Sequence, residues 1–210
     1  ARGHPGDRFY SSIVSETEHT LILYGGALVG PHQRLSPNYE VWRLTLGDSS
    51  QQAVEGNWTR LETTNDSGPY VSFENQKPPV VGHVSAMTLE GDMLVFGGYD
   101  GYLLQLAGPT ICTLTASLWK LNLDGASSAN NGQPNYWPNM WEALWSKSMT
   151  NGPIPDPRSH HACHVLGSAF PSGNQQLICH GGIDCHSLFL GDTWSFDLVQ
   201  GRWSQLLGET

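Results

Sequence analysis

The chain has 210 residues, few charges and no long apolar run. Asp, Glu, Lys and Arg make up 14% of it, well below the quarter or so found in an average domain. Ten Lys and Arg residues are spread along the chain and the net charge is −9, so the sequence lacks the basic patch that nucleic-acid binding requires. No stretch approaches the ~18 apolar residues of a membrane-spanning helix. We therefore expect no nucleic-acid partner and no membrane span.

The sequence also lacks a helical pattern of any length, whereas it holds 24 Gly and 8 Trp. Short apolar or alternating segments between Gly-rich turns are typical of a β-sandwich, barrel or propeller. Gly-x-Ser-x-Gly, P-loop and dinucleotide-binding motifs are absent. The expected fold class is all-β, and we expect neither catalysis nor a cofactor.

One pattern occurs three times, namely an apolar strand that ends in two adjacent glycines. The glycine pairs are Gly25-Gly26, Gly97-Gly98 and Gly181-Gly182, the next strand carries Trp42, Trp119 or Trp194, and the strand after it carries Trp58, Trp141 or Trp203. A pattern that recurs along the chain indicates a repeated structural unit rather than a catalytic motif. Glycine allows close backbone approach, and the tryptophans are expected to fill the space between neighbouring units. We assign all twelve residues a structural role.

The alignment of these marks divides the chain into three units of four strands, at about 8–62, 79–145 and 157–207. The expected strands are 8–14, 21–24, 41–46, 58–61, 83–87, 93–96, 118–123, 140–144, 161–165, 177–180, 193–198 and 202–206. A single unit of this kind cannot bury both of its faces, so the units are expected to stack around an axis.

These units resemble the kelch repeat. The third unit fits best, because Arg158 and His161 are similar to the kelch opening of Arg, two residues and His, and residues 190–198 resemble its third strand. The second unit keeps His83 but has Val80 at the arginine position, and the first keeps Arg8 but has Ser11 at the histidine position.

The resemblance implies a β-propeller of four-stranded antiparallel kelch blades, with three blades in residues 1–210. Propellers have about four to eight blades, and those of kelch type have six or seven. The remaining blades are expected from the parent chain or from a second chain. Three blades alone are expected to expose two apolar outer faces.

Long loops distinguish these units from a typical kelch repeat, and insertions on a rigid scaffold are where function usually resides. The loops between strands 2 and 3 and the crossings between blades emerge on one face. The candidate binding residues on that face are His32, Arg34, Tyr99, Asp100, Tyr102 and His186. We expect a cytoplasmic binding scaffold, or adaptor, for a protein or peptide. The alternatives are a secreted carbohydrate-binding or oxidase-type propeller and a structural subunit of a large assembly.

The cysteines leave two alternatives open: bridges 163–179 and 112–185, or four free thiols. Five histidines fall in the third unit (His160, His161, His164, His180 and His186), but their spacing to cysteine does not match a zinc site, and no metal is expected. A copper oxidase resembling galactose oxidase would need a Tyr–Cys crosslink, and the loop with Tyr102 and Cys112 shows no matching motif. The sequons at Asn57 and Asn65 occur at about the frequency chance predicts, so they do not indicate secretion.

Overall fold

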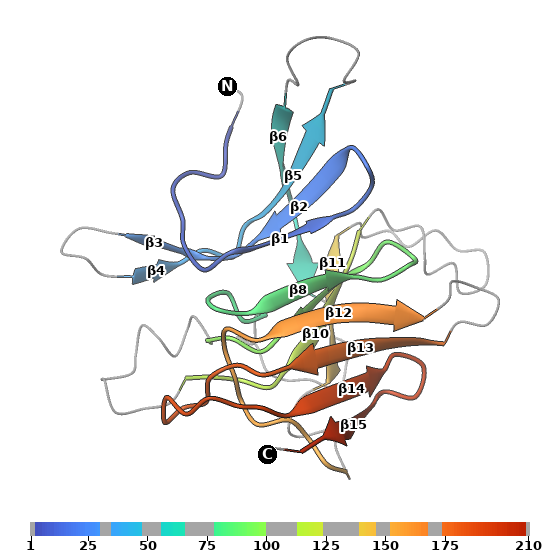
Figure 1. The fold of residues 1–210 in the computed structure, drawn as a ribbon. Coiled ribbons are helices and arrows are strands. Elements are labelled where there is room, and N and C mark those ends of the chain that lie inside the picture. The colour runs from blue at the N-terminus through green and yellow to red at the C-terminus, as the bar shows by residue number, and fades with distance from the viewer. Residues whose placement is uncertain are drawn as a thin grey trace.

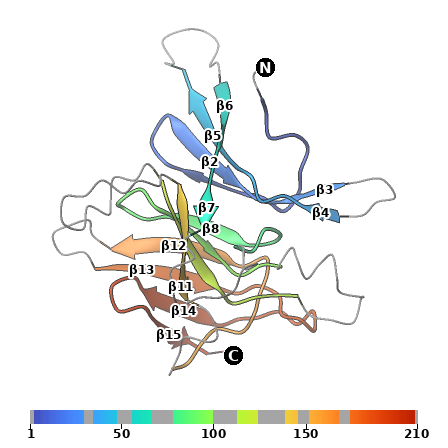
Figure 2. The same ribbon diagram turned by 180° about the vertical axis from the view of Figure 1, so that it is seen from behind.

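The computed structural model describes residues 3–29, 35–47, 56–65, 78–99, 113–123, 139–145, 152–167 and 174–208. In these residues the regular secondary structure consists of strands alone, which form three large sheets and a two-stranded one (Figures 1 and 2). Across the same ranges, no helix long and apolar enough to span a membrane is found. The all-β class expected from the sequence is confirmed.

The first sheet, which we call blade 1, is a meander of four antiparallel strands. Its order is β1 (Ser12–Ser15), β2 (Thr20–Tyr24), β5 (Val41–Leu46) and β6 (Gly56–Leu61). The connection between β2 and β5 contains a small hairpin of β3 (Ala27–Val29) and β4 (Leu35–Pro37). The hairpin projects from the end of blade 1 where the loops between the second and third strands emerge (Figure 1).

Blade 2 has the same meander with one added strand. It comprises β8 (Val84–Met87), β9 (Met93–Phe96), β10 (Leu118–Asn122) and β11 (Met140–Trp145). β7 (Thr64–Asn65), which follows blade 1 in the chain, pairs in parallel with the outer strand β11. The connecting segment therefore covers part of the exposed edge of blade 2.

Blade 3 comprises β12 (Ala162–Gly167), β13 (Gln175–His180), β14 (Thr193–Asp197) and β15 (Arg202–Leu207). All twelve strands expected from the sequence are present within a few residues of the expected bounds. β3, β4 and β7 were not expected, and β7 lies outside the three units drawn from the sequence. The first strand of blade 1 begins at Ser12 and not at Arg8.

Two apolar cores hold the three blades together. The first lies between blades 1 and 2 and includes Ile22, Tyr24 and Val41 from one side and Val95 and Trp119 from the other. The second lies between blades 2 and 3 and includes Phe96, Leu118, Leu177, Trp194 and Trp203. Successive residues of a strand face opposite sides, so the four buried residues of β9 contribute to both cores. This double burial explains why β9 is apolar throughout.

The two outer faces of the three-blade stack differ in polarity. On blade 1 the outer face carries apolar residues, including Leu23 and Leu44, with the half-buried Trp58 and with Trp42 covered by the segment around Gly3. On blade 3 the outer face is mixed, because His164, His180 and Thr193 share it with Ile178 and with the exposed Leu166 and Leu207. The outer face of blade 3 is therefore less apolar than that of blade 1, because His180 occupies the position of Tyr24 and Phe96.

Candidate functional site

In blade 3, a buried ion pair lies at the base of the loops on the face where the binding residues are expected. Arg158, which is fully buried, donates from Nη1 to Asp192 Oδ1 (2.6 Å) and from Nη2 to Asp192 Oδ2 (2.8 Å). Arg158 Nη1 also donates to the carbonyl of Gly181, and the indole Nε1 of Trp194 donates to Asp192 Oδ2. Burial alone would raise the pKa of Asp192, but the hydrogen bonds from Arg158 and Trp194 hold that pKa below its ordinary value. Bidentate pairing of this kind fixes geometry as well as charge.

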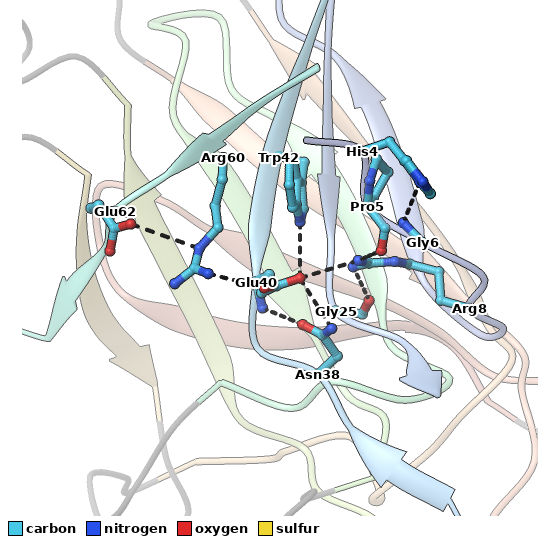
Figure 3. A network of polar contacts seen from close by, with 10 residues as sticks. All are labelled: His4, Pro5, Gly6, Arg8, Gly25, Asn38, Glu40, Trp42, Arg60 and Glu62. Atoms are coloured by element: carbon cyan, nitrogen blue, oxygen red, sulfur yellow. Dashed lines mark hydrogen bonds and ion pairs between the residues drawn. The ribbon is translucent and has the colours of Figure 1, made fainter. Parts of the chain in front are cut away.

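Blade 1 repeats this arrangement with glutamate in place of aspartate (Figure 3). Arg8 donates to Glu40 Oε2 (3.3 Å) and to the carbonyl of Gly25 (3.1 Å), and Trp42 Nε1 donates to the same Oε2 (3.0 Å). Arg60 adds a second cation, with its Nη1 at 3.2 Å from Glu40 Oε1. The acid two residues before the third-strand tryptophan of blades 1 and 3 was missed in the sequence, although the repeat alignment places Glu40 and Asp192 at one position.

Blade 2 lacks both charges. Val80 stands where blades 1 and 3 have arginine, and Ser117 stands where they have the acid. The indole of Trp119 donates to Ser117 Oγ (3.2 Å) instead. Both members of the pair are replaced together, so neither a buried arginine nor a buried carboxylate is left uncompensated.

The glycine pairs lie where successive blades meet. Gly26 N donates to the carbonyl of Val80 (2.6 Å), and Gly98 N donates to the carbonyl of Arg158 (2.7 Å). At Gly97, where φ is +64°, a Cβ would lie 2.6 Å from His161 Cε1 and 2.7 Å from the Arg158 carbonyl. A side chain at this position would collide with the next blade, so the structural role expected for this glycine follows from its surroundings.

Just before the first strand of each blade, where the propeller expected from the sequence would have its axis, one repeat position has left-handed backbone in all three blades. It is occupied by Tyr10 (φ 57°), Gly82 (φ 66°) and His160 (φ 56°). Gly82 N donates to the Tyr10 carbonyl (3.2 Å), and His160 N donates to the Gly82 carbonyl (3.1 Å). The rings of Tyr10 and His160 meet edge to face, with centroids 5.2 Å apart, and both side chains are exposed. We call these three residues the axial set.

A second exposed group lies on the loop between β13 and β14. Asp184 Oδ1 accepts hydrogen bonds from the backbone N–H groups of His186 and Leu188, both at 2.8 Å, and its Oδ2 lies 3.3 Å from His186 Nδ1. The bond from Leu188 is the main reason that the pKa of Asp184 lies below its ordinary value. On this turn Leu188 is 62% exposed, and the adjacent Phe189 is 86% exposed.

The apolar turn and the axial set belong to one surface. Ser159, next to His160, bridges to Ile183, and Ile183 bridges to Phe189. Two strand spacings therefore separate the segments of His160 and Phe189, or roughly 10 Å. We call Tyr10, His160, His186, Leu188 and Phe189 the candidate surface.

Two of the six binding residues expected from the sequence fall within the described ranges. Tyr99 is half-buried, packs against the first core and bonds through its backbone N–H to the Val81 carbonyl (2.8 Å). His186 is exposed, and no hydrogen bond, ion pair or ring contact joins it to Tyr99. His32, Arg34, Asp100 and Tyr102 lie outside the described residues. Tyr10, His160, Leu188 and Phe189 were not among the expected binding residues, and the alignment of Tyr10 with Gly82 and His160 was the available signal for the first two.

A serine and a histidine lie within hydrogen-bonding distance between blades 1 and 2, but they do not form a nucleophile–base pair suited to catalysis. Ser12 Oγ is 2.6 Å from His83 Nε2 and 2.5 Å from Ser85 Oγ. Burial lowers the pKa of His83 to about 3, whereas an efficient general base has a pKa near the working pH. Among the described side chains, no group of three or more His, Cys, Asp or Glu is arranged to hold a metal ion.

Cys163 and Cys179 form a disulfide between the neighbouring strands β12 and β13, so for this pair the free-thiol alternative is wrong. Cys185 is also disulfide-bonded. Cys112, the partner suggested by the sequence, lies outside the described residues.

Comparison with known proteins gives structural neighbours but no family. No family model and no curated protein matches the chain. It is similar to the structure of YjhT, with a TM-score of 0.57 and 12% identity over 97% of this chain and 53% of that one. It is also similar to the cryo-EM structure of RAG in complex with one melted RSS and one unmelted RSS, with a TM-score of 0.52 and 11% identity over 95% of this chain and 50% of that one. The chain thus spans about half the length of these neighbours, and the likeness shows the fold alone.

Proposed function

We propose that the chain supplies three blades of a kelch-type β-propeller that binds a protein or peptide through the candidate surface. The observation that carries this proposal is the exposure of Phe189 and Leu188 on a turn held by Asp184. A large apolar side chain on a pinned turn loses little conformational freedom when a partner covers it. Exposed apolar patches that are rimmed by polar residues often mark interaction sites.

The chemistry of the surface favours a partner with an apolar anchor and hydrogen-bonding groups. Phe189 and Leu188 provide apolar area, while Tyr10, His160 and His186 add rings with polar atoms. Aromatic residues dominate the binding energy of many protein interfaces. In contrast, the buried histidines His83 and His161 belong to the junctions between blades and are not available to a ligand.

Kelch membership and a larger ring are parts of the same proposal. They are supported by the repeated Arg–acid–Trp contacts in blades 1 and 3 and by neighbours of about twice the length. The remaining blades would come from the parent chain or from a second chain. Of the functions weighed from the sequence, binding without catalysis is the one that the candidate surface supports.

A peptide display library offers a direct test, because a library of random peptides can be selected before any partner is identified. Peptides are selected on the immobilised chain, and their affinities are then measured for Phe189→Ala and Val199→Ala variants. Val199 is a matched control because it is 71% exposed and also sits on an aspartate-pinned turn, at the opposite end of β14. We expect Phe189→Ala to weaken binding about tenfold or more, and Val199→Ala to leave it nearly unchanged. Peptides that tolerate Phe189→Ala but are lost with Val199→Ala would place binding on the other face.

A further inference from the structure

The two sequons, at Asn57 and Asn65, differ in their structural surroundings, although the sequence alone does not distinguish them. Asn57 lies on the outermost strand of blade 1, and its side chain is exposed, as is that of Thr59 two residues later. Its cross-strand neighbour Thr45 is exposed as well. Asn65 lies on β7, whose backbone pairs with β11. An N-linked glycan needs the Asn-x-Ser/Thr triplet and a surface with free space around the asparagine, and Asn57 meets both requirements.

The disulfides supply an independent observation about the compartment. Cys163 and Cys179 are bonded, Cys185 is bonded, and among the described cysteines none is free. Structural disulfides form and persist in secreted and endoplasmic-reticulum proteins and are rare in the cytosol. The Cys163–Cys179 bridge lies against the core between blades 2 and 3, which makes it part of the packed fold.

We propose that the chain matures in an oxidising secretory compartment and that Asn57 carries an N-linked glycan there. The donor is an oligosaccharide linked to a polyprenyl diphosphate. Asn57 Nδ2 loses one proton and forms a bond to C1 of the first sugar, while the bond between C1 and the diphosphate oxygen breaks. The polyprenyl diphosphate leaves as an anion, and no electrons are exchanged with an oxidant or reductant.

The folded structure has room for a glycan at Asn57, and the position of Asn57 indicates which face that glycan would shield. Asn57 is the second residue of β6 and pairs with Thr45 near the end of β5, so it lies at the end of blade 1 where β5 connects to β6. The candidate surface lies at the other ends of the strands, where β2 connects to β5 and β13 to β14. The Asn57 side chain also has no hydrogen bond or ion pair to a described residue. A glycan at Asn57 would therefore shield the face opposite the candidate surface.

Peptide mapping of the protein from its source cells tests the proposal. Trypsin cleavage after Arg43 and Arg60 yields the peptide 44–60, which contains the Asn57 sequon and excludes Asn65. Treatment with peptide-N-glycosidase in ¹⁸O-water should convert Asn57 to labelled Asp in most copies of this peptide. Alkylation without reduction should leave Cys163 and Cys179 unlabelled. An unmodified Asn57, a glycan at Asn65 alone, or alkylated Cys163 and Cys179 would each overturn the proposal.

Matched variants, expressed through the secretory pathway, test whether the glycan depends on the sequon itself or on the structure of strand β6. Thr59→Ser keeps the hydroxyl that the transferase requires and should keep the glycan, whereas Thr59→Ala and Asn57→Gln should remove it. Asn65→Gln should leave the peptide 44–60 glycosylated. Transfer precedes folding, so the glycopeptide can be measured in cell extract even for a variant that is not secreted. Loss of the glycan in Thr59→Ser together with its retention in Thr59→Ala would contradict the assignment. Glycosylation of the peptide 44–60 does not depend on the binding proposal, which is tested separately by the Phe189 and Val199 variants.

Discussion

At the residue scale, Arg158 and Asp192 show how one repeat position is filled in two ways. In blade 3 both groups are charged and almost fully buried, and each satisfies the other. In blade 2 the same positions hold Val80 and Ser117, and Trp119 keeps its hydrogen bond by using the serine hydroxyl. The chain thus contains its own double substitution. It indicates that the charged pair can be replaced if both members change together.

We predict that Arg158→Val alone will lower the free energy of unfolding by about 3–5 kcal/mol, because the Asp192 carboxylate is left buried without its partner. The double variant Arg158→Val, Asp192→Ser reproduces the blade 2 arrangement and should recover most of this loss. Urea unfolding of the two variants and the parent chain measures both values. If the double variant is no more stable than the single one, the buried carboxylate is not the source of the loss.

At the element scale, blades 2 and 3 each place a buried histidine against the preceding blade. His83 packs on Tyr24 with ring centroids 5.1 Å apart, and His161 packs on Phe96 at the same distance. Burial lowers the pKa of each to about 3, from an ordinary 6.5. The folded chain therefore holds both rings neutral at a pH where the unfolded chain begins to protonate them.

This difference in pKa sets the sign of a pH effect. The stabilising contribution is complete above about pH 6.5 and declines as the pH falls toward 3, because the unfolded chain binds the protons. At pH 5 each histidine should cost about 2 kcal/mol. The pKa of Glu40 and of Asp192 is also lowered, from 4.5 and 3.8, so these carboxylates act only at lower pH. The window from pH 6.5 to 4.5 thus reports mainly on the histidines.

The measurement is the free energy of unfolding against pH. His161→Phe keeps a flat ring in the junction and cannot be protonated, so it should flatten the slope in this window. His186→Phe replaces an exposed ring and serves as the control. Equal slopes for His161→Phe and the parent chain would show that the junction histidine is not responsible.

The sequence predicted the elements that repeat and missed those that do not. Three aligned glycine pairs and six aligned tryptophans locate twelve strands. β7 has two residues and pairs in parallel with the next blade, so no local sequence pattern predicts it. The axial Tyr10 escaped notice because its role depends on a left-handed backbone shared with Gly82 and His160. The exposure of Phe189 depends on where its turn lies in the folded sheet, which residue type alone does not reveal.

At the scale of the whole molecule, the second glycine of a pair donates its backbone N–H to the following blade. Gly26 N bonds to blade 2 and Gly98 N bonds to blade 3, whereas Gly182 N has no such partner within the ranges the structure describes. The first glycines show the same difference. A Cβ at Gly97 meets His161 at 2.6 Å, but a Cβ at Gly181 meets, of the described residues, only the Leu190 carbonyl, at 3.3 Å. Among the described residues, the junction on the far side of blade 3 therefore lacks the contacts that are made at the first two junctions.

Alanine at these glycines measures whether a further blade fills that junction. Gly91 has φ +91° with nothing within 4 Å, so Gly91→Ala reports backbone strain alone, about 1–2 kcal/mol. Gly97→Ala adds the collision with blade 3 and should cost about 2–5 kcal/mol. In the isolated 210-residue chain, Gly181→Ala should resemble Gly91→Ala. When a further blade of the proposed ring, from the parent chain or from a second chain, packs against blade 3, Gly181→Ala should resemble Gly97→Ala, because that blade would bring its own backbone against Gly181. An equal cost of Gly181→Ala in both settings would mean that the outer face of blade 3 stays open and that ring closure does not use it.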